Sequence, residues 1–215
     1  MDAFKETKRT RVVRAAKRGH YDHKTVYAIL DEALICHVGA VIEDKSAVIP
    51  TAHWRQDNRL YIHGSSGNRL LRAAAGREVC IAVTLMDGLV MARSGFHHSV
   101  NYRSVIVYGI AEPVDDAAEK LDALEVFMEK IAPGRWPELR PATKKEIDST
   151  LVLVVDLKEV SAKVRSGPPI DDEPDYALPI WAGVIPLRVT TGAPVPDPQL
   201  TKGIDLPAYL RPGAP

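Results

Sequence analysis

Polar and apolar residues alternate through much of this chain, and a period of two is the pattern of β-strands that bury one face. Six stretches have this character: 35–42, 47–54, 59–63, 79–85 continued by 89–93 after a turn at 86–88, 102–114 and 151–164. Three further segments have the spacing of amphipathic helices: 23–33, 68–75 and 117–131. The strands do not alternate with helices as a parallel sheet requires. The pattern therefore predicts a mainly β (α+β) fold, an antiparallel barrel with peripheral helices.

Charge and cysteine usage narrow the classes of function. The chain has 28 Lys and Arg against 28 Asp and Glu, so its net charge gives it no reason to seek nucleic acid or an anionic membrane. Its two cysteines, Cys36 and Cys80, lie in apolar stretches and are expected to be buried thiols. No apolar run approaches the roughly 20 residues that span a bilayer. The first 18 residues lack the apolar centre of a signal peptide, so we expect a cytoplasmic protein.

The composition divides the chain into three parts. Residues 1–20 form a basic N-terminal arm, expected to be extended or partly ordered, and residues 21–190 carry the periodic pattern of a single domain. Residues 191–215 form a proline-rich tail with few large apolar side chains. Such a tail cannot build its own core, so we expect it to wrap over the body or over a partner.

The segment from residue 61 to residue 69 has the best anion chemistry in the sequence. A strand ends there, two glycines free the backbone, and a helix begins with Ser66 or its neighbour as the N-cap. Helix starts favour anions, and Arg69 and Arg72 share one helix face from which they could bond a phosphate. The alternative is a capped helix with two solvated arginines. Gly76 has the position of a left-handed C-cap for this helix.

Two other clusters could contact a ligand. His97 and His98 are adjacent on a strand and point to opposite faces, and no HxxxH or HExxH spacing exists, so no metal site is predicted. Lys163 and Arg165 share a strand face and give local positive charge, while Trp181 has small neighbours that leave room for a flat ring. A salt-bridged turn and a core tryptophan explain these last features equally well. Because no catalytic triad or carboxylate pair is evident, a redox protein whose cofactor carries the chemistry is favoured over a hydrolase.

Several motifs occur in order along the chain: RGHYD at 18–22, IPTAHWR at 49–55, LYIHGS at 60–65, FHHSVNYRS at 96–104, KVRSGPPID at 163–171 and WAGVIP at 181–186. In these motifs the sequence resembles the pyridoxamine 5′-phosphate oxidase-like superfamily of FMN-binding split β-barrels. Within it, the chain is most similar to the branch of flavin-nucleotide-binding proteins that is related to the 5-nitroimidazole resistance reductases. The resemblance implies an antiparallel six-stranded split β-barrel.

The resemblance also implies a homodimer that holds two FMN molecules in its interface. A strand would lie along the isoalloxazine through Pro50, Thr51, Ala52, His53, Trp54 and Arg55. The following turn and helix would hold the phosphate and ribityl chain through Ile62, His63, Ser65, Asn68 and Arg69. Ser104 would contact the cofactor, and Trp181 would come from the second subunit.

Two departures limit what the resemblance implies about the substrate. Leu70 stands where the oxidases have a phosphate-binding lysine, and the Arg-x-His pattern of the oxidases is missing after Trp181. Pyridoxine phosphate is therefore not the expected substrate.

The resulting expectation is an FMN-dependent oxidoreductase that passes electrons from a reduced nucleotide to a small organic acceptor, such as a nitroaromatic compound. His63 and His98 would act as proton donors, because histidine titrates near neutrality. A different class is a non-catalytic flavin or haem binding and storage protein, in which histidines serve as axial ligands. A deazaflavin could also occupy the phosphate turn.

Overall fold

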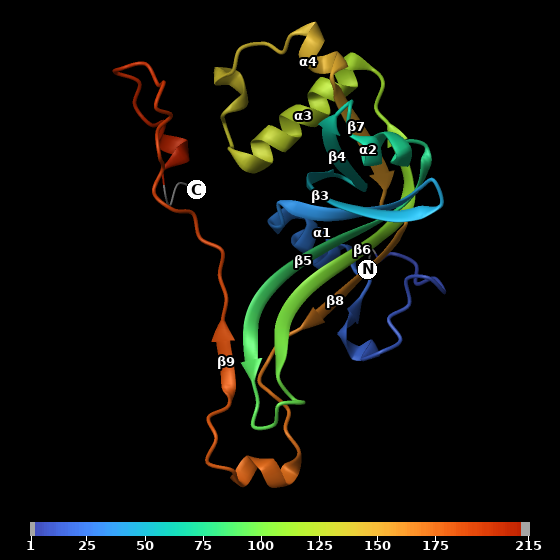
Figure 1. Cartoon of the computed structure of the whole chain (residues 1–215), viewed down its shortest axis with the longest axis vertical. Coiled ribbons are helices and arrows are strands. Elements are labelled where there is room, and N and C mark those ends of the chain that lie inside the picture. Colours follow the sequence, from blue (N-terminus) through green and yellow to red (C-terminus); the bar gives the residue numbers. More distant parts are fainter. Residues whose placement is uncertain (1–2, 212–215) are drawn as a thin grey trace.

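Six antiparallel strands close on themselves in the computed structural model, in which residues 3–211 are described (Figure 1). Around the ring they are β6 (Ser99–Pro113), β7 (Thr150–Asp156), β4 (Arg59–Ser65), β3 (Lys45–Gln56), β2 (Ile35–Ile42) and β5 (Arg77–Met91). The second pairing of β5 with β6 closes the ring. The predicted six-stranded antiparallel barrel is therefore confirmed.

The ring of strands is split where β3 separates from β4. β3 pairs with β4 only from His53 to Gln56, whereas its residues Lys45 to Ala52 pair with β2 on the other side. In the described part of the chain, no strand pairs with the β4-side edge of this first half of β3. Three strands lie outside the ring: β8 (Glu159–Arg165) on β6, β1 (Gly19–His20) on β8, and β9 (Gly183–Pro186) on β5.

The core fills the barrel with alternate side chains of its strands. Val38, Leu60, Ile81, Val107 and Val155 are all fully buried in one cluster. Each such aliphatic side chain stabilises the fold by about 1.5–3 kcal/mol. Two helices close the barrel: α1 (His23–Glu32), which buries Val26, Ile29 and Leu30, and α2 (Arg69–Ala74), which buries Leu70, Leu71 and Ala74.

A second, smaller cluster lies outside the barrel, under α3 (Ala117–Ile131). It joins Trp54, Tyr61 and Val152 of the sheet to Ala123 of the helix. Near the end of α3, the Nζ of Lys130 donates hydrogen bonds to three carbonyl oxygens: those of Leu30 (2.9 Å), Ala33 (2.6 Å) and His53 (3.2 Å). Lys130 thereby connects α3 to the end of α1 and to β3.

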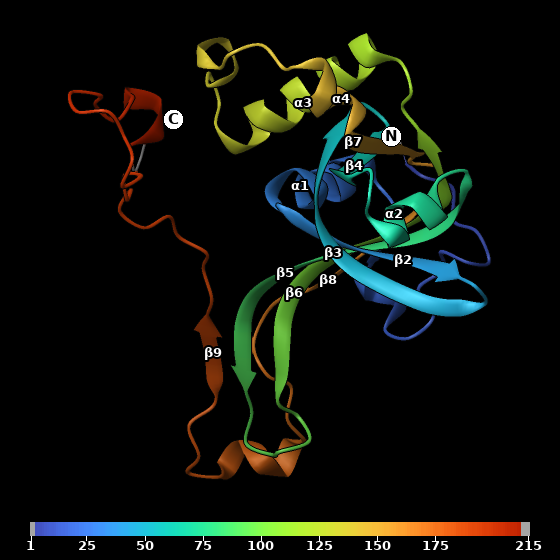
Figure 2. The same ribbon diagram turned by 45° about the horizontal axis from the view of Figure 1, so that its top comes forward.

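The strands β5 and β6 continue beyond the barrel as a long arm, and β9 runs beside it (Figures 1 and 2). A β-bulge between Met86 and Gly88 lies where the arm leaves the barrel. The carboxylate of Asp87 at this bulge accepts hydrogen bonds from Arg103, which also donates to Glu32 of α1. The tail then leaves β9 and returns to the region after α3, where Arg135 donates to the Tyr209 hydroxyl (3.1 Å).

Two sequence predictions about strands were wrong. Residues 86–88 were expected to form a turn, but they are a bulge in one continuous strand, because β6 pairs with both halves of β5. Residues 151–164 were expected to be one strand, but the chain reverses at Leu157 and Lys158. Before the reversal β7 pairs with β4, and after it β8 pairs with β6. Seven elements among the described residues were not predicted: β1, β9, the short helix α4 (Lys144–Asp148) and the 3-10 turns Ala16–Arg18, Trp136–Glu138, Glu173–Ala177 and Ala208–Leu210.

The N-terminal arm has little regular structure but is packed against the domain. Phe4 is 7% exposed and belongs to the core cluster. The Tyr21 hydroxyl accepts from the Val12 amide (3.0 Å) and donates to the Thr10 carbonyl (3.2 Å), which ties the arm to the residues before α1. Among residues 3–211, no helix combines the length and the apolar character that a membrane crossing requires.

Candidate functional site

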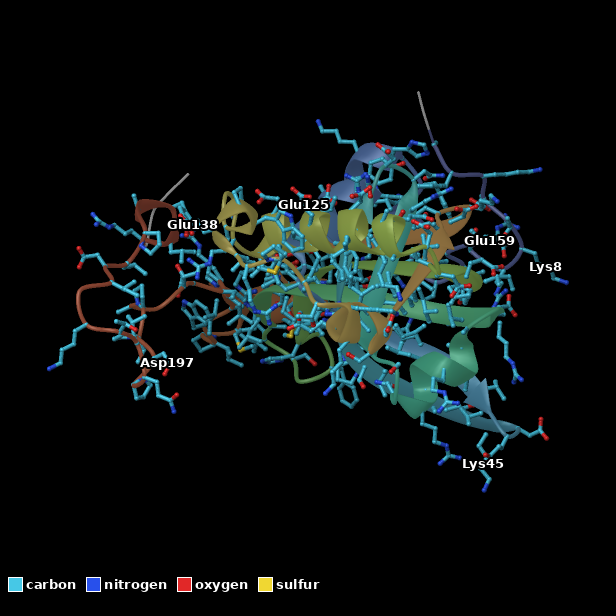
Figure 3. The ribbon with its side chains drawn as sticks, turned by 90° about the horizontal axis from the view of Figure 1, so that it is seen from above. Lys8, Lys45, Glu125, Glu138, Glu159 and Asp197 are labelled. Atoms are coloured by element: carbon cyan, nitrogen blue, oxygen red, sulfur yellow. The ribbon has the colours of Figure 1, made fainter. Side chains whose placement is uncertain are left out.

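The first half of β3 and the start of α2 face each other across a shallow groove of about 640 Å³. Ala47 and Ile49 line it from β3, and Asn68, Arg69 and Leu70 line it from α2. A second hollow of about 390 Å³ shares Arg69 and is lined by three arginines, Arg69, Arg72 and Arg77. Lys45 also lines the groove, at the tip of the β2–β3 hairpin in Figure 3. The groove thus has an apolar strand on one side and positive charge at one end.

The turn between β4 and α2 is fixed by its own hydrogen bonds. The Ser66 amide donates to the Ser149 carbonyl (2.8 Å), and the Asn68 amide donates to the Ser65 carbonyl (2.8 Å). Oδ1 of Asn68 accepts from the amides of Leu70 (3.0 Å) and Leu71 (3.1 Å), so the N-cap is Asn68 and not Ser66. The oxygen of Asn68 is used within the helix, and its Nδ2 is the group that can reach a ligand.

Glycines allow this turn to approach the barrel closely. A Cβ atom on Gly64 would lie 2.7 Å from Cδ1 of Leu71, so a larger residue would separate β4 from α2. Gly76 has a φ of 69°, which confirms the left-handed position expected at the end of α2.

Arg69 lies at the end of the groove in an exposed ion pair. Its Nη2 is 3.0 Å from Oε2 of Glu43, and the two side chains are 73% and 77% exposed. Exposed ion pairs of this kind contribute little to stability because water and salt screen them. An incoming phosphate can therefore replace Glu43 as the partner of Arg69 at low cost.

The second half of the predicted flavin strand turns away from the groove. The side chains of His53 and Trp54 are fully buried. Nε2 of His53 lies 3.0 Å from the Leu30 carbonyl, and Arg55 forms a bidentate pair with Asp31 (2.9 and 2.6 Å). Of the predicted set, Pro50, Thr51 and Ala52 come next along β3 after Ile49, which is the last β3 residue that lines the groove. Thr51 Oγ1 donates to the His63 carbonyl (3.1 Å), which holds β3 to β4 at the split.

His63 lies in an aromatic cluster on the α3 side of β4. Its ring centroid is 4.7 Å from that of Phe127 and 5.6 Å from that of Trp54, and Trp54 stacks on Tyr61. Its buried Nδ1 has no hydrogen-bond partner among the described residues. Desolvation lowers the pKa of His63, so the imidazole is neutral at neutral pH. A neutral ring can bind a metal or accept a proton, but it is a poor proton donor.

The structure does not bring the other predicted residues to the groove within one chain. Ile62 is fully buried, with both edges of its strand paired, and Ser65 uses its Oγ to accept from the Gly67 amide (3.2 Å). His98 lies beyond the end of β5, with Nδ1 2.9 Å from the Ser94 carbonyl. Ser104 lies on β6 and donates to the Lys163 carbonyl, and Trp181 is 68% exposed just before β9. Sequence reasoning missed Ala47, Ile49 and Glu43, although the alternation along β3 assigns 47, 49 and 51 to one face.

Comparisons with known proteins agree with this architecture. Residues 22–164 match a family model described as pyridoxamine 5′-phosphate oxidase. The solved structure of the flavocytochrome Anf3 from Azotobacter vinelandii is 44% identical, with a TM-score of 0.91 over 94% of this chain and 95% of that one. The FAD and haem binding protein from Mycobacterium smegmatis is 34% identical, with a TM-score of 0.85 over 89% of this chain and 95% of that one. No curated protein matches the sequence.

A more distant structure shares the fold alone. It is assigned to 5-nitroimidazole antibiotic resistance in Bacteroides thetaiotaomicron and is 22% identical, with a TM-score of 0.55 over 66% of this chain and 84% of that one. The family model covers most of the barrel, and the two closer structures extend the likeness through the arm. The resemblance seen in the sequence is confirmed, and the chain belongs to the pyridoxamine 5′-phosphate oxidase family.

Proposed function

We propose that this protein binds a flavin and a haem and transfers electrons, taking them from a reduced nucleotide and delivering them to a small acceptor. The observation that carries the proposal is the likeness to two flavin- and haem-binding proteins, at 44% and 34% identity over nearly the whole chain. The more distant of the two is described as an FAD binder. We therefore propose FAD as the native flavin, in place of the FMN implied by the sequence resemblance.

The groove between β3 and α2 fits the flavin. The unpaired edge of the first half of β3 offers backbone groups to the polar edge of a flat ring, and Ala47 and Ile49 offer apolar contact. Arg69, with Arg72 in the adjoining hollow, supplies charge for a phosphate group. A bound flavin supplies the ability to accept and return electrons, while these residues bind and orient it. Leu70 is buried in the core, so Arg72 replaces the lysine that the oxidases have at this position.

His63 fits the requirements of an iron ligand better than the other described histidines. A histidine that would hold haem iron must present a neutral imidazole, and burial against Trp54 and Phe127 keeps His63 neutral. His53 is also buried, but its Nε2 bonds the Leu30 carbonyl. Both ring nitrogens of His97 lie near carboxylates, Nδ1 3.6 Å from Asp171 and Nε2 3.9 Å from Asp172. We assign the haem contact to His63 on these grounds.

A homodimer is part of the proposal. Four large apolar side chains on one face of the sheet are about half exposed or more: Ile35, Val41, Val48 and Met86. Two more are almost fully exposed on the tail: Val189 and Val195. A second copy would cover this apolar surface and would bring Trp181 and His98 of its arm toward the first copy.

Absorption spectroscopy of the purified protein tests the function. We expect the visible bands of a flavin together with the Soret band of a haem, and the mass of FAD in the released ligand. His63→Gln should lose the Soret band and keep the flavin, while the matched variant His98→Gln keeps both. A colourless protein that takes up neither cofactor on addition would refute the function. Loss of haem in His98→Gln alone would refute the assignment of His63.

Arg69 and Glu43 provide a paired test of the phosphate position. Arg69→Gln should weaken flavin binding by about 1–3 kcal/mol, or roughly 5- to 150-fold, because a charged hydrogen bond to the phosphate is lost. Glu43→Gln should strengthen binding, because it removes the carboxylate that competes for Arg69. Flavin affinity is measured by fluorescence quenching on titration of the apoprotein. Equal affinity in wild type and both variants would place the phosphate elsewhere.

A further inference from the structure

Three basic residues lie near one another where the N-terminal arm joins the edge of the sheet: Arg18, Lys163 and Arg165, here called the β8 basic cluster. Gly19 pairs with Lys163, and His20 pairs with Ala162, so β1 places Arg18 beside the end of β8. None of the three forms an ion pair with a carboxylate among residues 3–211. The chain as a whole has equal numbers of acidic and basic residues, so this local excess is built by the fold.

Arg165 differs from the other two members of the cluster because it is buried, with only 7% of its surface exposed. Within the described residues, its guanidinium has one hydrogen-bond acceptor, Oδ1 of Asn101, which is neutral. Asn101 is itself held by a bond from its Nδ2 to the Gly167 carbonyl (3.1 Å). Burial, with Arg18 nearby, lowers the pKa of Arg165. A desolvated guanidinium without a counter-charge is unfavourable, so a buried arginine is normally paired.

Other largely buried arginines among the described residues follow that rule, as Arg55 does with Asp31. Arg103 donates to both Glu32 and Asp87, and Nη1 of Arg93 lies 3.0 Å from Asp171, whose side chain is fully buried. Arg165 is more buried than either Arg93 or Arg103 and has no carboxylate partner within residues 3–211. Its counter-charge must therefore come from outside the described chain.

We propose that the β8 basic cluster is a second anion site, which takes a diphosphate group, either free or as part of a nucleotide. Two guanidinium groups and one ammonium group match the charge of a diphosphate, and planar guanidinium groups bond phosphate oxygens in pairs. Tyr102, which pairs with Arg165 across the strands, offers an aromatic ring beside the site. Within one chain the site is separate from the flavin groove, because β6, β5 and β2 lie between β8 and β3 in the sheet. The proposal does not depend on the flavin.

Isothermal titration of the full-length protein, saturated with flavin, tests the site with three probes: ADP, inorganic pyrophosphate and adenosine. We expect ADP and pyrophosphate to bind, more weakly as salt rises, and adenosine not to bind. Tighter binding of ADP than of pyrophosphate assigns the site to a nucleotide, and equal binding assigns it to diphosphate alone. The double variant Arg18→Gln/Lys163→Gln, in which both residues are partly exposed, should bind ADP at least 10-fold more weakly.

Controls separate this site from the rest of the molecule. Lys158→Gln, at the other end of β8 and exposed, should leave the ADP affinity unchanged, and Arg69→Gln should also leave it unchanged. Arg165→Lys keeps the charge but loses the paired geometry, so it should weaken binding by a smaller factor. The proposal is overturned if ADP and pyrophosphate do not bind at millimolar concentration or if the double variant binds as wild type does. It is also overturned if the double variant shifts the dimer dissociation constant while neither probe binds, since a partner's carboxylates would then be the counter-charge.

Discussion

Replacing Lys130 with methionine should lower the free energy of unfolding by about 2–4 kcal/mol, because three backbone carbonyl oxygens lose their common donor. Methionine keeps much of the volume of the side chain, so the loss reports on the hydrogen bonds rather than on a cavity. Burial lowers the pKa of Lys130 to about 8, which leaves the ammonium charged at neutral pH. The Leu30 carbonyl would keep the ring of His53 as a hydrogen-bond partner in this variant. The Ala33 carbonyl, 2.6 Å from the Nζ of Lys130, would lose that donor.

Chemical denaturation at pH 7 measures this loss, and Lys144→Met is the matched control. Lys144 is 87% exposed and, in the described part of the chain, its ion-pair partner is Asp148 on α4, so its replacement should change stability by less than about 0.5 kcal/mol. Similar stabilities for the two variants would show that Lys130 does not connect α3 to α1 and β3 in solution.

Acidification from pH 7 to pH 4 should reduce the free energy of unfolding by about 3 kcal/mol through His53 alone. Burial, together with the nearby Lys130, lowers the pKa of His53 to about 4 from its ordinary value of 6.5. Between these two pH values the unfolded chain binds a proton at this position and the folded chain does not. Stability therefore falls as the pH decreases through this window, and this contribution becomes constant below pH 4.

The variant His53→Gln isolates this effect. Glutamine can still donate to the Leu30 carbonyl but cannot titrate, so its stability should fall less steeply than that of wild type between pH 6.5 and pH 4. Denaturation curves at intervals of half a pH unit give the two slopes. Parallel slopes would contradict a buried neutral His53. Because His53 and Lys130 share the Leu30 carbonyl, the effects of replacing both should not add.

Much of the barrel could be predicted from the sequence because its strands bury alternate residues, and this leaves a period of two. The errors occurred where pairing over long sequence distances decided the structure. Met86-Asp87-Gly88 has the composition of a turn, yet β6 pairs on both sides of it and leaves only a bulge. The reversal at Leu157 has no glycine or proline to mark it, and Leu157 is itself buried in the core.

The candidate site was predicted in part, because some of its features depend on neighbouring residues in the sequence. The glycines and arginines of the turn before α2 are local signals, and the groove forms there. Burial is not a local property, so the motif at 49–55 gave no sign that His53 and Trp54 face the interior. Lys130 lies 97 residues from Ala33 along the chain, and no pattern in the sequence connects the two.

The bulge at Asp87 is the point at which a change of backbone angle would be amplified along the arm. The backbone carbonyl of Asp87 accepts from the Leu187 amide (3.0 Å) after β9, and its carboxylate holds Arg103, which is fixed to α1 through Glu32. Asp87 therefore connects the arm to β9 through its backbone and to the barrel and α1 through its side chain. A small rotation at Asp87 would move the far end of the arm, with His98, over a much longer distance. A neutral residue at position 87 would therefore increase the motion of the tip most, while leaving the barrel closed.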